Sequence, residues 1–76
     1  MKLDTLKRGQ RSRIIKITGP DPLRQRLATL GILKGFEVSL LAVSPLGDPK
    51  AYRLGRQQVC LRNEDAACVE VEVIEG

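Results

Sequence analysis

Few residues of this 76-residue sequence could act in catalysis. Ser12, Ser39 and Ser44 are candidate nucleophiles, but the sequence contains no histidine that could serve as their general base. It also lacks a glycine-rich phosphate-binding loop, so it carries no nucleotide-hydrolysing motif of its own. We therefore expect no catalytic residues and a protein that is not an enzyme.

The two cysteines are the first candidates for metal ligands. Cys60 and Cys68 are eight positions apart, whereas paired zinc ligands are usually about two to four apart, and two thiolates leave half of a tetrahedral site empty. Asp48, Glu64 and Asp65 could offer oxygens to a hard cation, but side chains in turns also cap backbone N–H groups. We predict that the cysteines are structural and that the protein has no metal site and no cofactor.

Basic residues are concentrated in the first half of the sequence. Residues 1–34 hold nine Lys and Arg against two Asp, and residues 35–76 hold four against seven Asp and Glu, so the halves carry +7 and −3. The expected basic surface comprises Lys7, Arg8, Arg11, Arg13, Lys16, Arg24, Arg26 and Lys34. Such a surface could meet a phosphate backbone, an anionic membrane or an acidic protein face, or serve only solubility.

The sequence has no segment typical of secretion or of membrane insertion. Its N-terminus lacks the apolar run of a signal peptide, and no stretch approaches the roughly 20 apolar residues that span a bilayer. Two cysteines are too few for the disulfide framework of a small secreted domain. We expect a cytoplasmic protein that could be recruited to the inner face of the membrane.

The elements that would position these residues begin with a docking segment and a strand. Leu3 and Leu6 are expected to pack against the fold, with a turn at Gly9. Residues 11–18 alternate like a strand and carry isoleucine on both faces. An apolar residue on each face predicts a closed barrel or a covered sheet.

A short helix is predicted between residues 21 and 30. Asp21 can cap its first N–H groups, Pro22 suits the first helical position, and Gly31 favours a left-handed C-terminal cap. One helical face is expected in the core and comprises Leu23, Leu27 and Leu30.

From residue 35 onward the pattern predicts strands and turns. A buried strand is expected at 36–43 and further strands at 50–54, 57–62 and 68–74, separated by a loop at 45–49, a hairpin turn at 55–56 and a helical turn at 63–67 that Asn63 would cap. The last strand should turn Val69, Val71 and Val73 inward. We predict one domain over residues 1–76, mainly β: a small five-stranded barrel with one short α-helix between strands 1 and 2 and a short helical turn before the last strand.

Three segments in this order resemble the FeoA family. They are residues 26–38 (RLATLGILKGFEV), 45–49 (PLGDP) and 61–66 (LRNEDA), and the resemblance runs through nearly the whole sequence. Lys34 stands where many relatives have proline. The resemblance implies an SH3-like barrel with an accessory role in bacterial Fe(II) uptake. It also implies contact with the cytoplasmic side of the FeoB membrane permease, which carries a GTPase domain.

The surface predicted to bind the permease lies on the helix, the following turn and the 45–49 loop. Its members are Arg24, Arg26, Leu33, Lys34 and Leu46. Binding there would modulate the transport or the GTPase activity of the permease. Two alternatives stay open. One is a small basic SH3-like module for RNA or another nucleic acid. Its two aromatic residues would make a poor platform for stacking bases. The other is a homo-oligomer formed through an exposed barrel edge.

Overall fold

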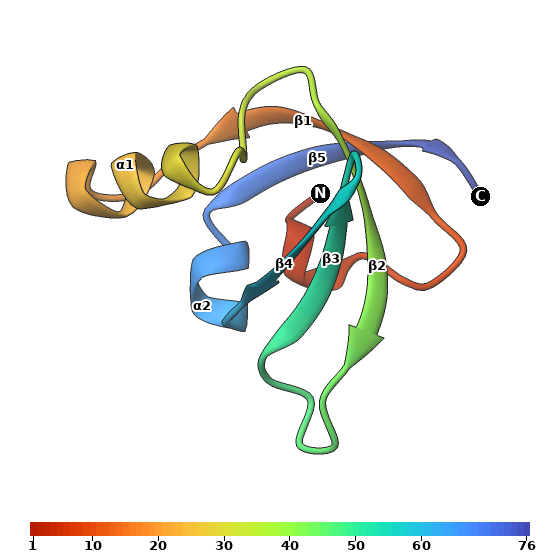
Figure 1. The fold of residues 1–76 in the computed structure, drawn as a ribbon. Coiled ribbons are helices and arrows are strands. Elements are labelled where there is room, and N and C mark those ends of the chain that lie inside the picture. Colours follow the sequence, from red (N-terminus) through yellow and green to blue (C-terminus); the bar gives the residue numbers. More distant parts are fainter.

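Five antiparallel strands form one sheet in the computed structural model, which describes all residues from 1 to 76 (Figure 1). The strands are β1 (Arg11–Ile17), β2 (Glu37–Val43), β3 (Lys50–Leu54), β4 (Gln57–Leu61) and β5 (Val69–Glu75), and the helical segments are η1 (Leu3–Thr5), α1 (Asp21–Thr29) and α2 (Asn63–Ala66). This architecture confirms the predicted mainly β fold, with one helix between the first two strands and a short one before the last.

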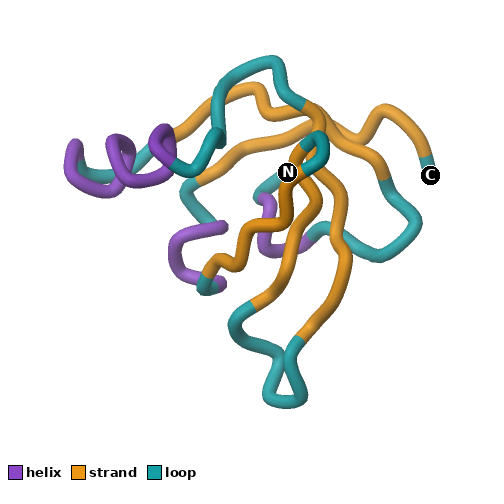
Figure 2. The backbone as a smooth tube through the Cα atoms, in the orientation of Figure 1, coloured by secondary structure: helices purple, strands orange, loops and turns teal.

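The strand order is β4-β3-β2-β1-β5, so β4 and β5 are the two edges of the sheet. In the figures, β1 and β5 run across the upper part of the molecule while β2, β3 and β4 run down from it (Figures 1 and 2). The sheet is therefore strongly twisted and curves around its inner face (Figure 1). Helix α2 connects the two edge strands, β4 and β5.

The core draws side chains from every strand and from all three helical segments. It consists of Leu3, Leu6, Ile14, Leu27, Ile32, Val38, Tyr52, Leu54, Val59, Leu61, Ala66, Val69 and Val71. Leu3 and Leu6 are 1% and 3% exposed, which confirms that the N-terminal segment docks on the fold. The predicted left-handed cap is also confirmed, because Gly31 has a φ of 90°.

Helix α1 buries less of its leucine face than predicted. Leu27 is fully buried and Leu23 is partly buried against the core, but Leu30 is 37% exposed. Leu30 is the C-terminal cap residue of α1. The chain turns away there toward Ile32, which takes the buried position instead.

Two expected strand burials are wrong. In β2 only Val38 is buried, and Phe36 precedes the strand with 49% of its surface exposed. Val73 of β5 is 39% exposed rather than inward, whereas Val69 and Val71 are fully buried. The β1–β5 register shifts beside Val73, and the end of β5 extends beyond the barrel (Figure 1).

The predicted helix caps are also wrong. Pro20 and Arg62 hold the N-cap positions of α1 and α2, and neither makes a side-chain capping bond. Asp21 and Asn63 are instead the first residues of their helices, so Pro22 takes the second helical position rather than the first. The Asn63 N–H donates to Asp48 Oδ1 at 2.9 Å, so a carboxylate from the β2–β3 loop caps α2.

Candidate functional site

The five residues predicted to bind a partner are all exposed, but they lie at two ends of the molecule. Arg24 and Arg26 are on α1, and Leu33 and Lys34 are in the connection from α1 to β2. Leu46 is in the β2–β3 loop, at the opposite end of the fold (Figure 1). Four of the five therefore lie on α1 or in the connection that follows it, and the fifth, whose surface is 94% exposed, lies on another loop.

The α1–β2 connection carries an exposed apolar group that we call the apolar rim. It comprises Leu30, Leu33 and Phe36, which are 37%, 42% and 49% exposed. Gly31 and Gly35, with φ of 90° and 94°, turn the chain in this connection. Ile32 therefore enters the core, while Leu30 and Leu33 stay exposed. The sequence pattern identified only Leu33, because Leu30 and Phe36 were predicted to be buried.

The arginines of α1 already have acidic partners. Arg24 pairs with Asp21 one turn earlier in α1, and Arg26 Nη2 lies 2.9 Å from Asp65 Oδ2 of α2. These arginines are half or more exposed, so the pairs are weak enough for a partner's carboxylate to compete with them. Lys34 makes no ion pair and is the free cation beside the apolar rim.

The predicted basic surface is interrupted by acidic residues from the second half of the chain. Arg11 lies 2.9 Å from Glu37 and 3.0 Å from Glu75, because β1 is placed between β2 and β5. Hydrogen bonds to Glu37 and then Glu75 raise the pKa of the Arg11 guanidinium. Arg13 is 3.9 Å from the same Glu37 carboxylate. With Arg24 and Arg26, four of the eight predicted basic residues are thus ion-paired.

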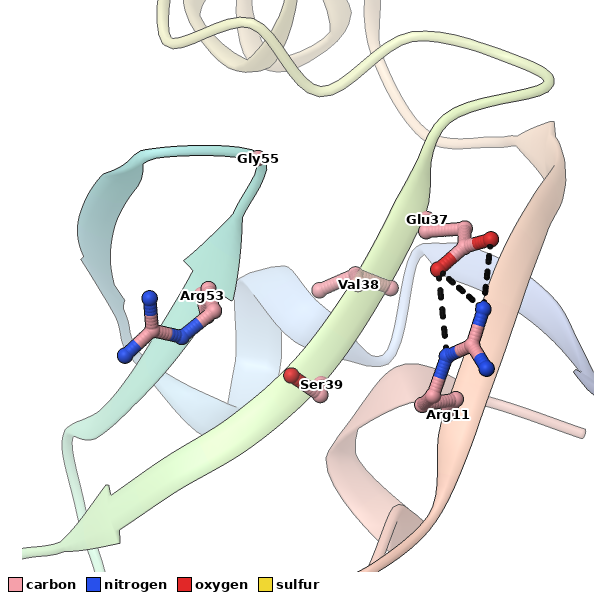
Figure 3. Close-up of a pocket in the computed structure, with 6 residues that line it drawn as sticks. All are labelled: Arg11, Glu37, Val38, Ser39, Arg53 and Gly55. Atoms are coloured by element: carbon pink, nitrogen blue, oxygen red, sulfur yellow. Dashed lines mark hydrogen bonds and ion pairs between the residues drawn. The ribbon is translucent and has the colours of Figure 1, made fainter. Parts of the chain in front are cut away.

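A shallow hollow of about 220 Å³ opens on the outer face of the sheet (Figure 3). The register places Arg11, Ser39 and Arg53 opposite one another on β1, β2 and β3. Arg11 is held by Glu37, whereas Arg53 makes no ion pair and extends away from that pair (Figure 3). The hollow is smaller than the roughly 300–1,000 Å³ of ordinary ligand pockets, so we assign no cofactor to it.

No three His, Cys, Asp or Glu side chains lie together as a metal site. Cys60 is exposed on β4, which contradicts a packing role for it, and Cys68 is half-buried after α2. Both thiols are free. Of the predicted oxygen donors, Asp48 caps α2 and Asp65 pairs with Arg26. Separately, no helix has the length and apolar character needed to cross a membrane.

Tyr52 is a fully buried residue whose hydroxyl has no hydrogen-bond partner. Burial, with smaller contributions from Asp4 and Asp48, raises the pKa of Tyr52 to about 12. The phenol is therefore neutral at physiological pH. The Lys50 ammonium donates to the Asp4 carbonyl at 2.7 Å.

Comparison with known proteins finds a family match over almost the entire chain. The FeoA domain family matches residues 1–73. A Porphyromonas gingivalis protein described as a fusion of Fe(2+) transport protein A and the Fe(2+) transporter FeoB is 36% identical over 74 residues. That match covers 97% of this chain but only 9% of the fusion protein.

Solved structures share both the fold and part of the sequence. Iron(II) transport protein A from Clostridium thermocellum matches with a TM-score of 0.92 and 35% identity over 97% of this chain, which spans 46% of that protein. Stenotrophomonas maltophilia FeoA, described as a prokaryotic SH3 domain protein and solved with zinc, matches with a TM-score of 0.81 and 29% identity. This match covers 95% of this chain and 89% of the other.

Proposed function

This chain belongs to the FeoA domain family, a family of non-catalytic accessory proteins of ferrous iron transport, and from that premise we propose that it binds a FeoB-type permease. The fold is SH3-like, as the resemblance implied. The proposed binding site is the cytoplasmic side of the permease, where the protein would modulate transport or GTPase activity. With no nucleotide motif of its own, it would act by contact alone.

The observation that carries this proposal is the Porphyromonas gingivalis fusion. There a region similar to this chain and a FeoB transporter are parts of one polypeptide. Covalent linkage keeps two domains at a high effective concentration, which benefits domains that act in contact. We infer that the separate chain makes the same kind of contact without the linkage.

The surface we propose for this contact is the apolar rim together with the cations beside it. Leu33 would enter an apolar site on the permease, and Lys34, Arg24 and Arg26 would face acidic groups around that site. Leu46, at the other end of the fold, would make a second contact. Together these residues would hold the barrel as a rigid adaptor on the permease.

The test is binding of this protein to detergent-solubilised, full-length FeoB-type permease, combined with Fe(II) uptake in cells. We expect the triple variant Arg24→Glu, Arg26→Glu and Leu33→Asp to bind at least about tenfold more weakly and to lower uptake. The matched control carries Lys7→Glu, Arg8→Glu and Val73→Asp, which alter exposed residues outside the proposed contact. It should lose much less affinity.

The proposal is wrong if the wild-type protein does not bind the permease, or if its deletion leaves uptake unchanged. Unchanged binding by the folded triple variant would reject the proposed surface while leaving the partnership intact. Tight, salt-sensitive binding to RNA with normal iron uptake would favour the nucleic-acid alternative.

A further inference from the structure

The outer edge of β4 carries peptide groups without partners in the fold. The β3–β4 hairpin pairs Leu54 with Gln57, Tyr52 with Val59 and Lys50 with Leu61. Because a two-residue turn joins the strands, these pairs exchange the ladder hydrogen bonds, and the peptide groups between them face outward. The outward groups are those of Gln58 and Cys60. No other backbone hydrogen bond of the chain uses them.

This edge is accessible as well as unpaired. β4 is the last strand of the sheet on its side, and both Gln58 and Cys60 are exposed. Two free N–H groups and two free carbonyls in an extended strand are a template for one further strand.

Three arginines surround the same edge. Arg53 lies opposite Gln58 on β3, Arg56 is in the hairpin turn, and Arg62 follows the end of β4. All three are exposed, and none forms an ion pair. No Asp or Glu occurs between residues 50 and 62. The free backbone groups therefore lie among three arginines that form no ion pair within the chain.

The same arginines disfavour a second copy of this chain as the occupant. Two β4 edges that pair antiparallel about a two-fold axis, using all the free peptide groups, would place Gln58 opposite the second copy's Cys60. In that register Arg56 of one copy lies opposite Arg62 of the other, and like charges in directly opposed positions are destabilising. An acidic strand would meet the opposite charge.

We propose that the outer edge of β4 binds an extended acidic segment of a partner protein. The segment would pair with the peptide groups of Gln58 and Cys60 as a sixth strand and place its carboxylates near Arg53, Arg56 and Arg62. This site does not include the apolar rim, and the proposal does not depend on the identity of the permease.

The test uses the full chain and a synthetic seven-residue peptide that alternates Glu with Val and Thr, with its termini blocked. We expect chemical-shift changes centred on β4 and at least about tenfold slower hydrogen exchange of the Gln58 and Cys60 amides. A second peptide with Gln in place of each Glu controls for charge. It should bind at least about tenfold more weakly at low salt.

Variants separate the contributions of charge and backbone. Replacing Arg53, Arg56 and Arg62 by Gln should weaken binding at least about tenfold, whereas the matched triple variant with Lys7→Gln, Arg8→Gln and Lys16→Gln should change it less than about threefold. Gln58→Pro removes an outward N–H and should abolish binding. If Gln58→Pro does not fold, the arginine variant still decides the question, because its substitutions touch only exposed side chains.

Three results would overturn the proposal. Equal binding of the glutamine peptide would show that charge plays no part. Shift changes away from β4 would place the peptide elsewhere. A concentration-dependent dimer of the wild-type chain, with shift changes on β4, would make a second copy the occupant.

Discussion

The two edges of the sheet are finished in different ways. Along β5, the N-terminal amine of Met1 donates to the Val71 carbonyl at 2.9 Å, and the Val71 N–H donates to the Met1 carbonyl at 2.7 Å. Lys2 forms a bridge with Glu70 beside them. Along β4, the outward peptide groups of Gln58 have no partner in the chain. One edge is closed by the protein itself, and the other is left open.

The difference follows from what each edge has to protect. β5 is seven residues long and rich in valine, so an open β5 would be an apolar template for aggregation. Leu3 and Leu6 bury themselves in the core and hold the covering residues in place. β4 is five residues long and is flanked by Arg56 and Arg62, so its short length and charge discourage self-association. The same features would still allow an acidic strand to pair with β4.

The largest expected effect comes from removing the anchor of the closed edge. Leu3→Ala deletes a side chain that is 1% exposed, and we expect a loss of about 2–5 kcal/mol in the free energy of unfolding. Urea denaturation measures that loss, and hydrogen exchange should show the Val71 amide among the most accelerated. Leu46→Ala removes the same atoms from a side chain that is 94% exposed and should change stability by less than about 0.5 kcal/mol. Similar losses in both variants would show that η1 does not anchor the edge.

A pair of proline substitutions tests whether β4 is open on one side only. The Val59 peptide group faces β3, so Val59→Pro should cost about 3 kcal/mol or more in unfolding free energy. Gln58→Pro removes an N–H that faces solvent and should cost less than about 1 kcal/mol. Thermal unfolding of both variants gives the comparison. Equal destabilisation would mean that the outer edge of β4 is covered.

The third prediction concerns Tyr52, the large side chain beneath the β3–β4 hairpin. Its pKa is raised from 10.0 to about 12 in the folded state. The neutral phenol is therefore favoured by folding, and its stabilising contribution is complete below pH 10 and is lost as the pH rises toward 12. Tyr52 is the only tyrosine, and the chain has no tryptophan, so ultraviolet absorbance of tyrosinate reports this group directly.

Tyr52→Phe controls for this titration. It removes a buried hydroxyl that has no partner, so it should leave stability at neutral pH unchanged or slightly raised. It should also reduce the loss of stability as the pH rises from 10 toward 12. A folded-state titration midpoint near 10 would contradict the burial of the hydroxyl.

Local patterns predicted the elements and several turns correctly. The hairpin at Gly55 and the helix ending before Gly31 follow from short-range backbone preferences that tertiary contacts did not alter. The docking of Leu3 was also predictable, because an apolar pair in a short polar segment has few other uses. Burial at the ends of elements was not predictable. Val73 and Leu30 continue an apolar pattern past the place where the barrel ends.

Much of the candidate site depends on pairings that strand order alone decides. Arg11 looked like part of a basic face until β1 was placed between Glu37 on β2 and Glu75 on β5. The sequence likewise does not tell which strands lie at the edges of the sheet. Nothing in it therefore marked Gln58 as part of an open strand edge. The nearest available clue was the absence of any acid between residues 50 and 62.

The smallest expected effect compares single arginines near the two edges. Arg11 on β1 bridges to Glu75 on the closed edge and to Glu37 on β2, whereas Arg53 beside β4 has no ion pair. Arg11→Gln should lower the midpoint of thermal unfolding slightly at low salt, and the decrease should fade as salt screens the exposed pairs. Arg53→Gln should leave the midpoint unchanged at every salt concentration. A salt-dependent loss in Arg53→Gln would reveal a partner for this arginine within the fold, and the charge at the open edge would then no longer be free.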